Sequence, residues 1–226
     1  MKLTEALKKN RKNVVIAGVL AAILAVGGIS AYFTATQDRL NSWTVGKVAI
    51  DFEEPNYDSQ TPEEKANITP NKDLVKDPQI TNTGKNDAYV FMKVNVPKAN
   101  VAAAASDGVK LPAKVQELFN YTINDGWVKV TEDTGDQDVN TYVFAYAKNG
   151  KCTALKPQEK TNLLFRDEKI TFINIIEGQG LEGVTYELPI KAVAIQTYDL
   201  GDNDATAPAD VWAIANNSTS GHLNKM

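Results

Sequence analysis

Residues 88–97, with the sequence AYVFMKVNVP, decide the fold class of this 226-residue chain. Every second side chain is apolar, which is the period of an extended strand with one face against a core. The apolar positions on that face are Ala88, Val90, Met92, Val94 and Val96. The stretch therefore predicts a long strand, at the end of a strand region that begins at Gln79 and is interrupted near Gly84.

Similar segments recur on both sides of this strand, separated by turn residues. Strands are predicted within residues 43–52, 119–130, 141–147, 151–155, 163–165, 170–176 and 184–198. Asn124-Asp125-Gly126 and Asn149-Gly150 lie between β-forming residues, so each predicts a hairpin. Pro189 cannot donate a backbone hydrogen bond, and it predicts an edge position or a bulge in residues 184–198.

Helical signals are few. Residues 53–78 carry several prolines and many charges, and they predict a long surface excursion with one helical turn near residues 62–65. Helix-forming residues follow Pro112 as far as Leu118, and residues 210–215 predict a short helix capped by Asp210. A total of about eight to ten strands with little helix predicts an all-β fold, a jelly-roll-like β-sandwich over residues 43–216 with a flexible tail at 217–226.

The first 31 residues predict an export signal. Five basic residues precede a charge-free apolar run from Val14 to Ile29, and Ala31 follows where a signal peptidase would cut before Tyr32. The run is shorter than the roughly 20 residues that a membrane-spanning helix usually needs. Cleavage is the main prediction and an uncleaved membrane anchor is the alternative, and both place the following residues outside the cytoplasmic membrane.

Composition narrows the classes of function. Residues 1–31 hold five of the 24 basic residues and one of the 28 acidic ones, so the remainder has 19 basic and 27 acidic residues and a net charge near −8. Such a chain lacks the basic stripe that binds phosphates, and we expect no nucleic-acid partner. The single cysteine, Cys152, excludes an intramolecular disulfide, and we expect it to be a small buried or half-buried side chain.

The sequence contains no recognisable catalytic motif. The only histidine, His222, lies in the polar tail, so it offers neither a histidine pair for zinc nor a plausible Ser-His-Asp triad. Two acidic clusters, residues 132–138 and 199–204, carry oxygen atoms suited to calcium or carboxylates suited to sugar hydrolysis. Solvated turns are the simpler interpretation, so we expect no enzyme activity, no catalytic residue and no cofactor, with calcium as an alternative.

Four short stretches follow one another in a characteristic order. They are GGISAYFT at 27–34, NSWTVGKVAI at 41–50, ITNTG at 80–84 with AYV at 88–90, and IKAVAIQ at 190–196 with VW at 211–212. Together they resemble the TasA/camelysin family of exported biofilm-matrix proteins of Gram-positive bacteria. The first stretch is similar to signals cut by the dedicated, endoplasmic-reticulum-type signal peptidase of these bacteria, whereas residues 101–183 carry no matching motif.

The resemblance implies a jelly-roll subunit that polymerises head to tail into fibres by donor-strand complementation, in which the segment freed by signal cleavage adds a strand to the next subunit. The implied partners are further copies of the chain, the dedicated signal peptidase and other matrix proteins, and the implied location is the extracellular matrix or the cell surface. Residues 32–42 would hold the donor strand, which consists of Tyr32, Phe33, Thr34, Ala35, Thr36, Gln37, Asp38, Arg39 and Leu40. The metalloprotease activity ascribed to some members is not implied here, because the histidine pair is missing.

Two other functions stay open on the sequence alone. An uncleaved N-terminal helix would make the protein a membrane-anchored, monomeric adhesin or binding module of the cell surface. The acidic clusters would serve a secreted hydrolase. The export signal, the β-rich pattern, the missing catalytic set and the ordered motifs together favour the fibre subunit.

Overall fold

The structure of the chain is a computed structural model that describes residues 48–200 except Asn67, and residues 205–223, with side chains described as far as Asn217. These residues belong to one compact unit, Gly46–Met226. The predicted signal peptide, its cleavage site and the predicted donor strand all lie outside the described residues. The described part is mostly β, so the predicted all-β class is confirmed, and its paired sheets are compatible with a jelly roll.

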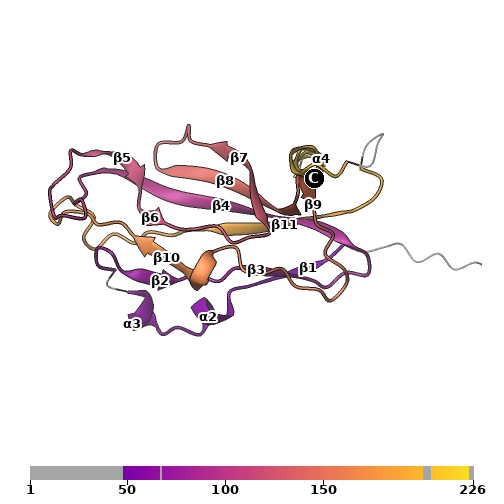
Figure 1. Ribbon diagram of the computed structural model, residues 1–226, viewed down its shortest axis with the longest axis horizontal. Coiled ribbons are helices and arrows are strands. Elements are labelled where there is room, and N and C mark those ends of the chain that lie inside the picture. The colour runs from indigo at the N-terminus through magenta and orange to yellow at the C-terminus, as the bar shows by residue number, and fades with distance from the viewer. Residues whose placement is uncertain (1–47, 67, 201–204, 224–226) are drawn as a thin grey trace, which may run out of the picture. The chain divides into compact units, whose positions relative to one another are not determined.

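The larger sheet is built around one long strand, β4 (Figure 1). Its antiparallel order is β11 (Ile190–Gln196), β4 (Ala88–Val101), β8 (Val139–Lys148) and β7 (Trp127–Asp133), with β5 (Lys114–Glu117) paired to the end of β4 and β9 (Lys151–Cys152) to the end of β8. The five apolar residues that the alternation placed on one face of β4 are all fully buried. The strand predicted from residues 88–97 is thus confirmed, and it runs four residues further.

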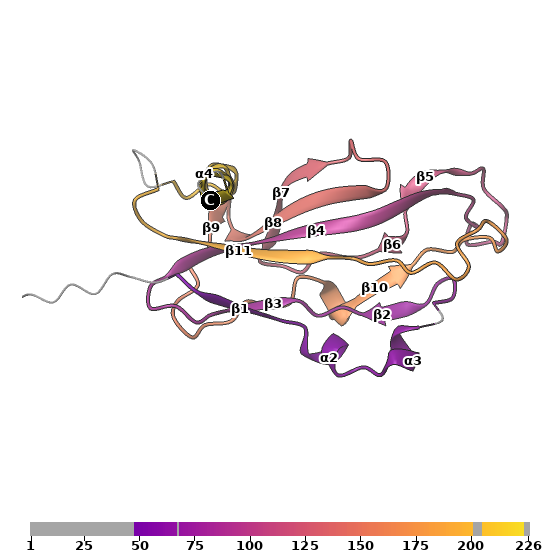
Figure 2. The same ribbon diagram turned by 180° about the vertical axis from the view of Figure 1, so that it is seen from behind.

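A second layer of short strands packs against that face of β4 (Figures 1 and 2). It consists of β1 (Ile50–Glu53) with β3 (Gln79–Asn82), and of β2 (Asp73–Val75), β10 (Lys169–Phe172) and β6 (Phe119–Asn120), with the helices α2 (Pro55–Asp58) and α3 (Pro62–Lys65) and the 3-10 turn η1 (Arg166–Glu168) between them. Ile80, Leu118 and Phe165 are fully buried between the layers. Burial of this apolar surface is the main stabilising contribution to the fold.

Helix α4 (Pro208–Leu223) covers the other face of the larger sheet. Val211 is buried in a second apolar cluster, against which Trp212 and Ile214 pack, and the Trp212 ring lies 5.4 Å from the ring of Phe91 on β4. The predicted helix at 210–215 is therefore present but longer. It takes in Asn217–Leu223 of the predicted tail, and Asp210 lies within its first turn rather than at its cap. β4 is consequently covered on both faces over its first half.

The helix predicted from Pro112 to Leu118 is wrong, because Lys114–Glu117 form strand β5. These residues pair with Lys98–Val101 at the end of β4, and Leu118 N–H donates to Pro97 O at 2.9 Å. A partner strand distant in sequence has overridden a weak local preference for helix.

The hairpin predicted at Asn124-Asp125-Gly126 is also wrong. β6 and β7 flank this turn, but β6 pairs with β10 in the second layer and β7 pairs with β8 in the larger sheet. In each strand an aromatic side chain contacts a ring of the partner strand. The Phe119 ring of β6 lies 5.6 Å from the Phe172 ring of β10, and the Trp127 ring of β7 lies 5.4 Å from the Tyr146 ring of β8. The turn therefore links the two layers. The hairpin predicted at Asn149-Gly150 is confirmed, since Lys148 pairs with Lys151 and both turn residues have positive φ.

The predicted excursion over residues 53–78 contains α2, α3 and β2. The helical turn at 62–65 is confirmed, and a capping box begins it: Thr61 Oγ1 accepts from Glu64 N–H while Thr61 N–H donates to Glu64 Oε2. Several other predicted strands are shorter than expected. Residues 151–155 are strand only over β9, and residues 170–176 only as far as Phe172 of β10. Residues 163–165 form only an isolated bridge at Phe165, and residues 184–198 are strand only over β11.

Candidate functional site

Strand β11 has no partner strand on its outer side among the described residues. Pro189 O accepts a hydrogen bond from Asn95 N–H at 3.0 Å, so these two residues face each other across the β11–β4 ladder. Bonded and non-bonded residue pairs alternate in an antiparallel ladder. The register therefore directs the N–H and C=O groups of four residues away from β4: Ile190, Ala192, Ala194 and Gln196. No strand within residues 48–200 or 205–223 pairs with this row of backbone groups.

Strand β1 likewise has a single partner strand, β3, in the part of the chain that the structure describes, and its other edge lies on the same side of the sandwich as the outer edge of β11. β3 pairs with β1 on one side, and on its other side Thr161 N–H donates to Ile80 O at 2.9 Å. Ala88 of β4 exchanges two backbone hydrogen bonds with Leu155 on the side of β8. Residues 155–161 therefore bridge the two layers on the side of the sandwich where β8 lies. Strands β1 and β11 border the opposite side, from which Figure 2 views the protein.

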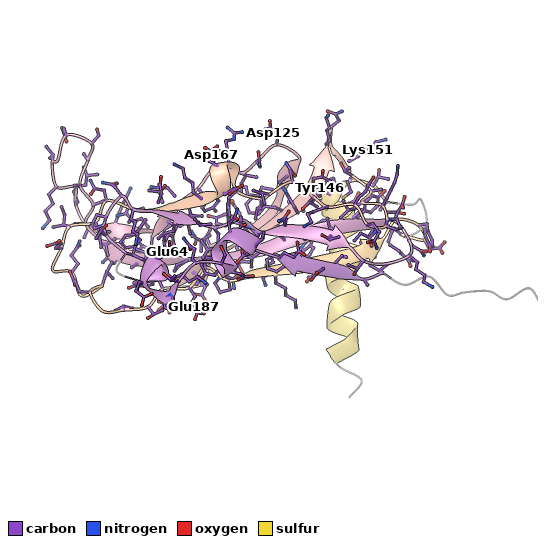
Figure 3. All side chains as sticks on the ribbon, turned by 90° about the horizontal axis from the view of Figure 1, so that it is seen from below. Glu64, Asp125, Tyr146, Lys151, Asp167 and Glu187 are labelled. Carbon is purple, nitrogen blue, oxygen red and sulfur yellow. The ribbon has the colours of Figure 1, made fainter. Side chains whose placement is uncertain are left out.

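Half-buried apolar side chains border this open side. They pack against the core between the layers but keep part of their surface exposed: Val48, Ile50 and Phe52 from β1 and the segment before it, and Ile190, Ala192 and Ala194 from β11. In Figure 3, Glu187, just before β11, lies at the edge opposite Asp125, Tyr146, Lys151 and Asp167. An extended segment laid along β11 would bury this border and pair the free backbone groups at once.

The other edge of the larger sheet, strand β7, is protected against such pairing. The register with β8 shifts between Lys129 and Thr131, which marks a bulge, and Lys129 forms an ion pair with Glu132 on the exposed strand. Bulges and charged side chains are the usual means by which proteins block edge-to-edge association. β11 pairs regularly with β4 over its whole length and carries one charge, Lys191. Of the two edges, β11 is the one suited to accept a strand.

A buried ion pair anchors the excursion that follows β1. Lys76 Nζ lies 2.8 Å from Glu54 Oε2, and their side chains are 12% and 11% exposed. Asp77 is fully buried and accepts hydrogen bonds from the N–H groups of Asn56 and Tyr57 at the start of α2. Burial raises the pKa of Glu54 even though Lys76 opposes the shift. The partners of these groups lie within the excursion itself, which points to a structural role.

The acidic cluster at 132–138 forms capped turns. Asp136 Oδ1 accepts hydrogen bonds from the N–H groups of Asp138 and Val139 at 2.7 and 3.1 Å, and these bonds lower the pKa of Asp136. Asp133 Oδ1 accepts from Gly135 N–H at 3.0 Å. Residues 201–204 of the second cluster lie outside the described residues. Within the part of the chain that the structure describes, no three metal-ligating side chains come together.

We expect the thiol of Cys152 to be unreactive in the folded protein. It is buried in the second apolar cluster, beside the segment that leads to α4, and burial raises its pKa to about 11. Because the thiolate is the reactive form, Ellman's reagent should label the native protein very slowly at mildly alkaline pH. After unfolding in guanidinium chloride it should label one thiol per chain at once. Rapid labelling of the native protein would contradict this prediction.

The residues predicted to act in assembly, Ala31 and Tyr32–Leu40, lie outside the described residues, so their roles stay predictions. His222 lies in the last turn of α4. The sequence pattern alone does not identify the open edge at Ile190–Gln196, although Pro189 is a signal for an edge position next to it.

In comparisons with known proteins, no family model matches this chain, and no curated protein or solved structure matches it either. None of the helices in the described residues has both the length and the apolar character needed to cross a membrane.

Proposed function

We propose that this protein is a structural subunit of an extracellular, biofilm-type fibre, which polymerises by donor-strand complementation after its signal peptide is removed. The observation that carries the proposal is the open edge of β11 with its half-buried apolar border. A segment from another copy would pair with the outward backbone groups of β11 and cover the side chains of Ile190, Ala192 and Ala194. In such strand addition, backbone hydrogen bonds supply affinity and alternate side chains supply specificity.

The proposed donor, Tyr32–Leu40, has a suitable length. Nine extended residues span about 30 Å and the seven residues of β11 about 23 Å. In the sequence, the donor is followed by the segment that enters the described fold at Val48. Ala49 O accepts hydrogen bonds from the N–H groups of Thr83 and Gly84, which shortly precede β4, so the chain enters the fold near the start of β4. A donor attached there and used by the next copy makes a head-to-tail contact, which repeats into a filament unless it closes into a ring.

The test of this proposal begins with protein secreted by its native host. N-terminal sequencing should find Tyr32 as the first residue, and electron microscopy of the same material should show fibres. A purified chain beginning at Tyr32 that stays monomeric at high concentration, even when seeded with its own aggregates, would contradict the proposal. An intact Met1 would instead favour a membrane-anchored adhesin.

We expect deletion of residues 32–40 from the cleaved protein to abolish fibres and leave a folded monomer. The deletion removes the proposed donor, whereas the described sandwich, with its two apolar clusters, keeps all of its residues. Sedimentation and electron microscopy measure assembly, and circular dichroism measures folding. A synthetic peptide of residues 32–40 should bind the deleted protein saturably, and the same residues in scrambled order serve as the control. Fibres formed by the deleted protein would exclude this segment as the donor.

A further inference from the structure

An open cleft of about 800 Å³ lies at the far end of the larger sheet from the start of β1. Its lining comes from four places in the chain: Pro97–Asn100 of β4, Val115 of β5, residues 136–139 at the turn into β8, and Tyr186 before β11. Lys98 lies ten residues along β4 from its first residue, Ala88, so the cleft is about 33 Å from the start of that strand. The volume is within the range of small-molecule sites and exceeds what a single side chain would fill.

The lining of the cleft includes polar side chains that make no hydrogen bond with other described residues. Asn100, Gln137 and Asp138 are exposed, and none of their side chains has a hydrogen-bond partner among the described residues. Asp136 accepts both of its turn hydrogen bonds through Oδ1. Two amides and two carboxylates thus offer donors and acceptors in a combination that suits vicinal hydroxyl groups, each of which both donates and accepts.

Other lining residues of the cleft carry apolar or aromatic side chains. Pro97 is buried, Val139 and the Tyr186 ring are half-buried, and Val115 is 60% exposed. Burial raises the pKa of Tyr186, so its hydroxyl stays a neutral donor and acceptor. Val115 and the Tyr186 ring both line the cleft and present apolar surface to which a flat, weakly polar face can dock.

The charges at the cleft disfavour an anionic ligand. Lys98 Nζ already donates to Thr134 O at 3.0 Å and to Asn140 Oδ1 at 2.9 Å, whereas Asp136 and Asp138 line the opening. The same ammonium group would oppose a cation placed deep in the cleft. We propose that this cleft binds a neutral oligosaccharide, with one sugar ring against Tyr186 and Val115 and its hydroxyls bonded to Asn100, Gln137 and Asp138. The proposal does not depend on the fibre function.

The test uses the full chain, kept soluble in a detergent without a sugar headgroup, and two uncharged probes, cellotriose and chitotriose. Saturation-transfer NMR should detect saturable binding of at least one trisaccharide. The variants Asn100→Ala and Asp138→Ala should each weaken it about fivefold, the worth of one net hydrogen bond. The matched controls Asn120→Ala and Asp51→Ala alter exposed residues of the second layer and should leave binding unchanged.

Three outcomes would overturn the proposal. The first is the absence of saturable binding of either trisaccharide, and the second is binding that neither cleft variant weakens. The third is binding of the cationic peptide trilysine, lost in Asp138→Ala, when neither sugar binds; the cleft would then be a cation site. Fibre assembly should be normal in Asn100→Ala and Asp138→Ala, so failure of the sugar proposal and failure of the fibre proposal give different results.

Discussion

Replacement of Ala194 by proline is expected to prevent fibre assembly while the subunit stays folded. The N–H of Ala194 points away from β4, so proline at this position removes no hydrogen bond from the β11–β4 ladder. On the open side, the change removes a donor, and the proline ring obstructs an approaching strand. The missing donor leaves an acceptor of the incoming strand unpaired, which costs about 1–3 kcal/mol and corresponds to an increase of about 5- to 150-fold in the critical concentration for assembly. Light scattering over a concentration series measures this value.

Two further substitutions separate the effect on assembly from an effect on folding. Ala194→Val keeps the N–H and suits a strand, so it should assemble as the unmodified protein does. Val193→Pro removes a hydrogen bond that faces β4, and its folded state should be markedly less stable than that of Ala194→Pro. Fibres of Ala194→Pro at the unmodified protein's critical concentration would show that β11 is not the acceptor.

The central position of β4 could be predicted because the pattern of apolar residues within the strand itself shows which of its faces are buried. Even-numbered residues from Ala88 to Val96 are apolar, and they face the second layer. Odd-numbered residues are aromatic at Tyr89 and Phe91, where α4 covers the sheet, and polar at Lys93 and Asn95 beyond it. Two apolar faces over the first half of the strand thus reflect two layers of cover, because a strand that is buried on both faces needs apolar side chains at every position.

The errors share one physical origin, which is pairing between residues distant in sequence. Lys114–Glu117 have no strong strand pattern of their own, and they are extended because the end of β4 offers a free edge. Asn124-Asp125-Gly126 makes a turn, as predicted, but Phe119 and Trp127 find aromatic partners in different layers. The open edge of β11 is likewise a property of sheet order. Pro189 indicated an edge, and only the topology shows that no described strand covers it.

Replacement of Lys76 by methionine is expected to destabilise the folded protein strongly. The side chains of Lys76 and Glu54 are both almost nine-tenths buried, so solvent screens their interaction little. Removing one partner of a buried ion pair costs about 3–5 kcal/mol, because the other charge stays buried without compensation. Glu54 Oε1 already has no hydrogen-bond partner in the described part of the chain. Guanidinium chloride unfolding of the monomeric protein that lacks residues 32–40 measures the free energy.

The pH dependence of this variant follows from the sign of the shift. Burial already raises the pKa of Glu54, and loss of the neighbouring ammonium should raise it further. A carboxyl whose pKa is higher in the folded than in the unfolded protein favours folding below its unfolded pKa and loses that contribution as pH rises through the folded pKa. The deficit of Lys76→Met should therefore be largest at neutral pH, shrink as the pH falls through the raised folded-state pKa of Glu54, and be smallest below the ordinary pKa of glutamate.

The double variant Glu54→Gln/Lys76→Met decides whether the buried charge is the cause of the deficit. A neutral glutamine needs no counter-ion, so the double variant should recover most of the stability at neutral pH and lose the pH dependence. Equal deficits in the single and double variants would mean that the contact of the Lys76 ammonium group with the Tyr57 ring, whose centroid lies 4.7 Å from Nζ, rather than the ion pair, holds α2 in place. Asp77 binds the start of α2 independently through Asn56 and Tyr57 N–H. The helix should therefore persist in the double variant, which keeps the comparison between two folded proteins.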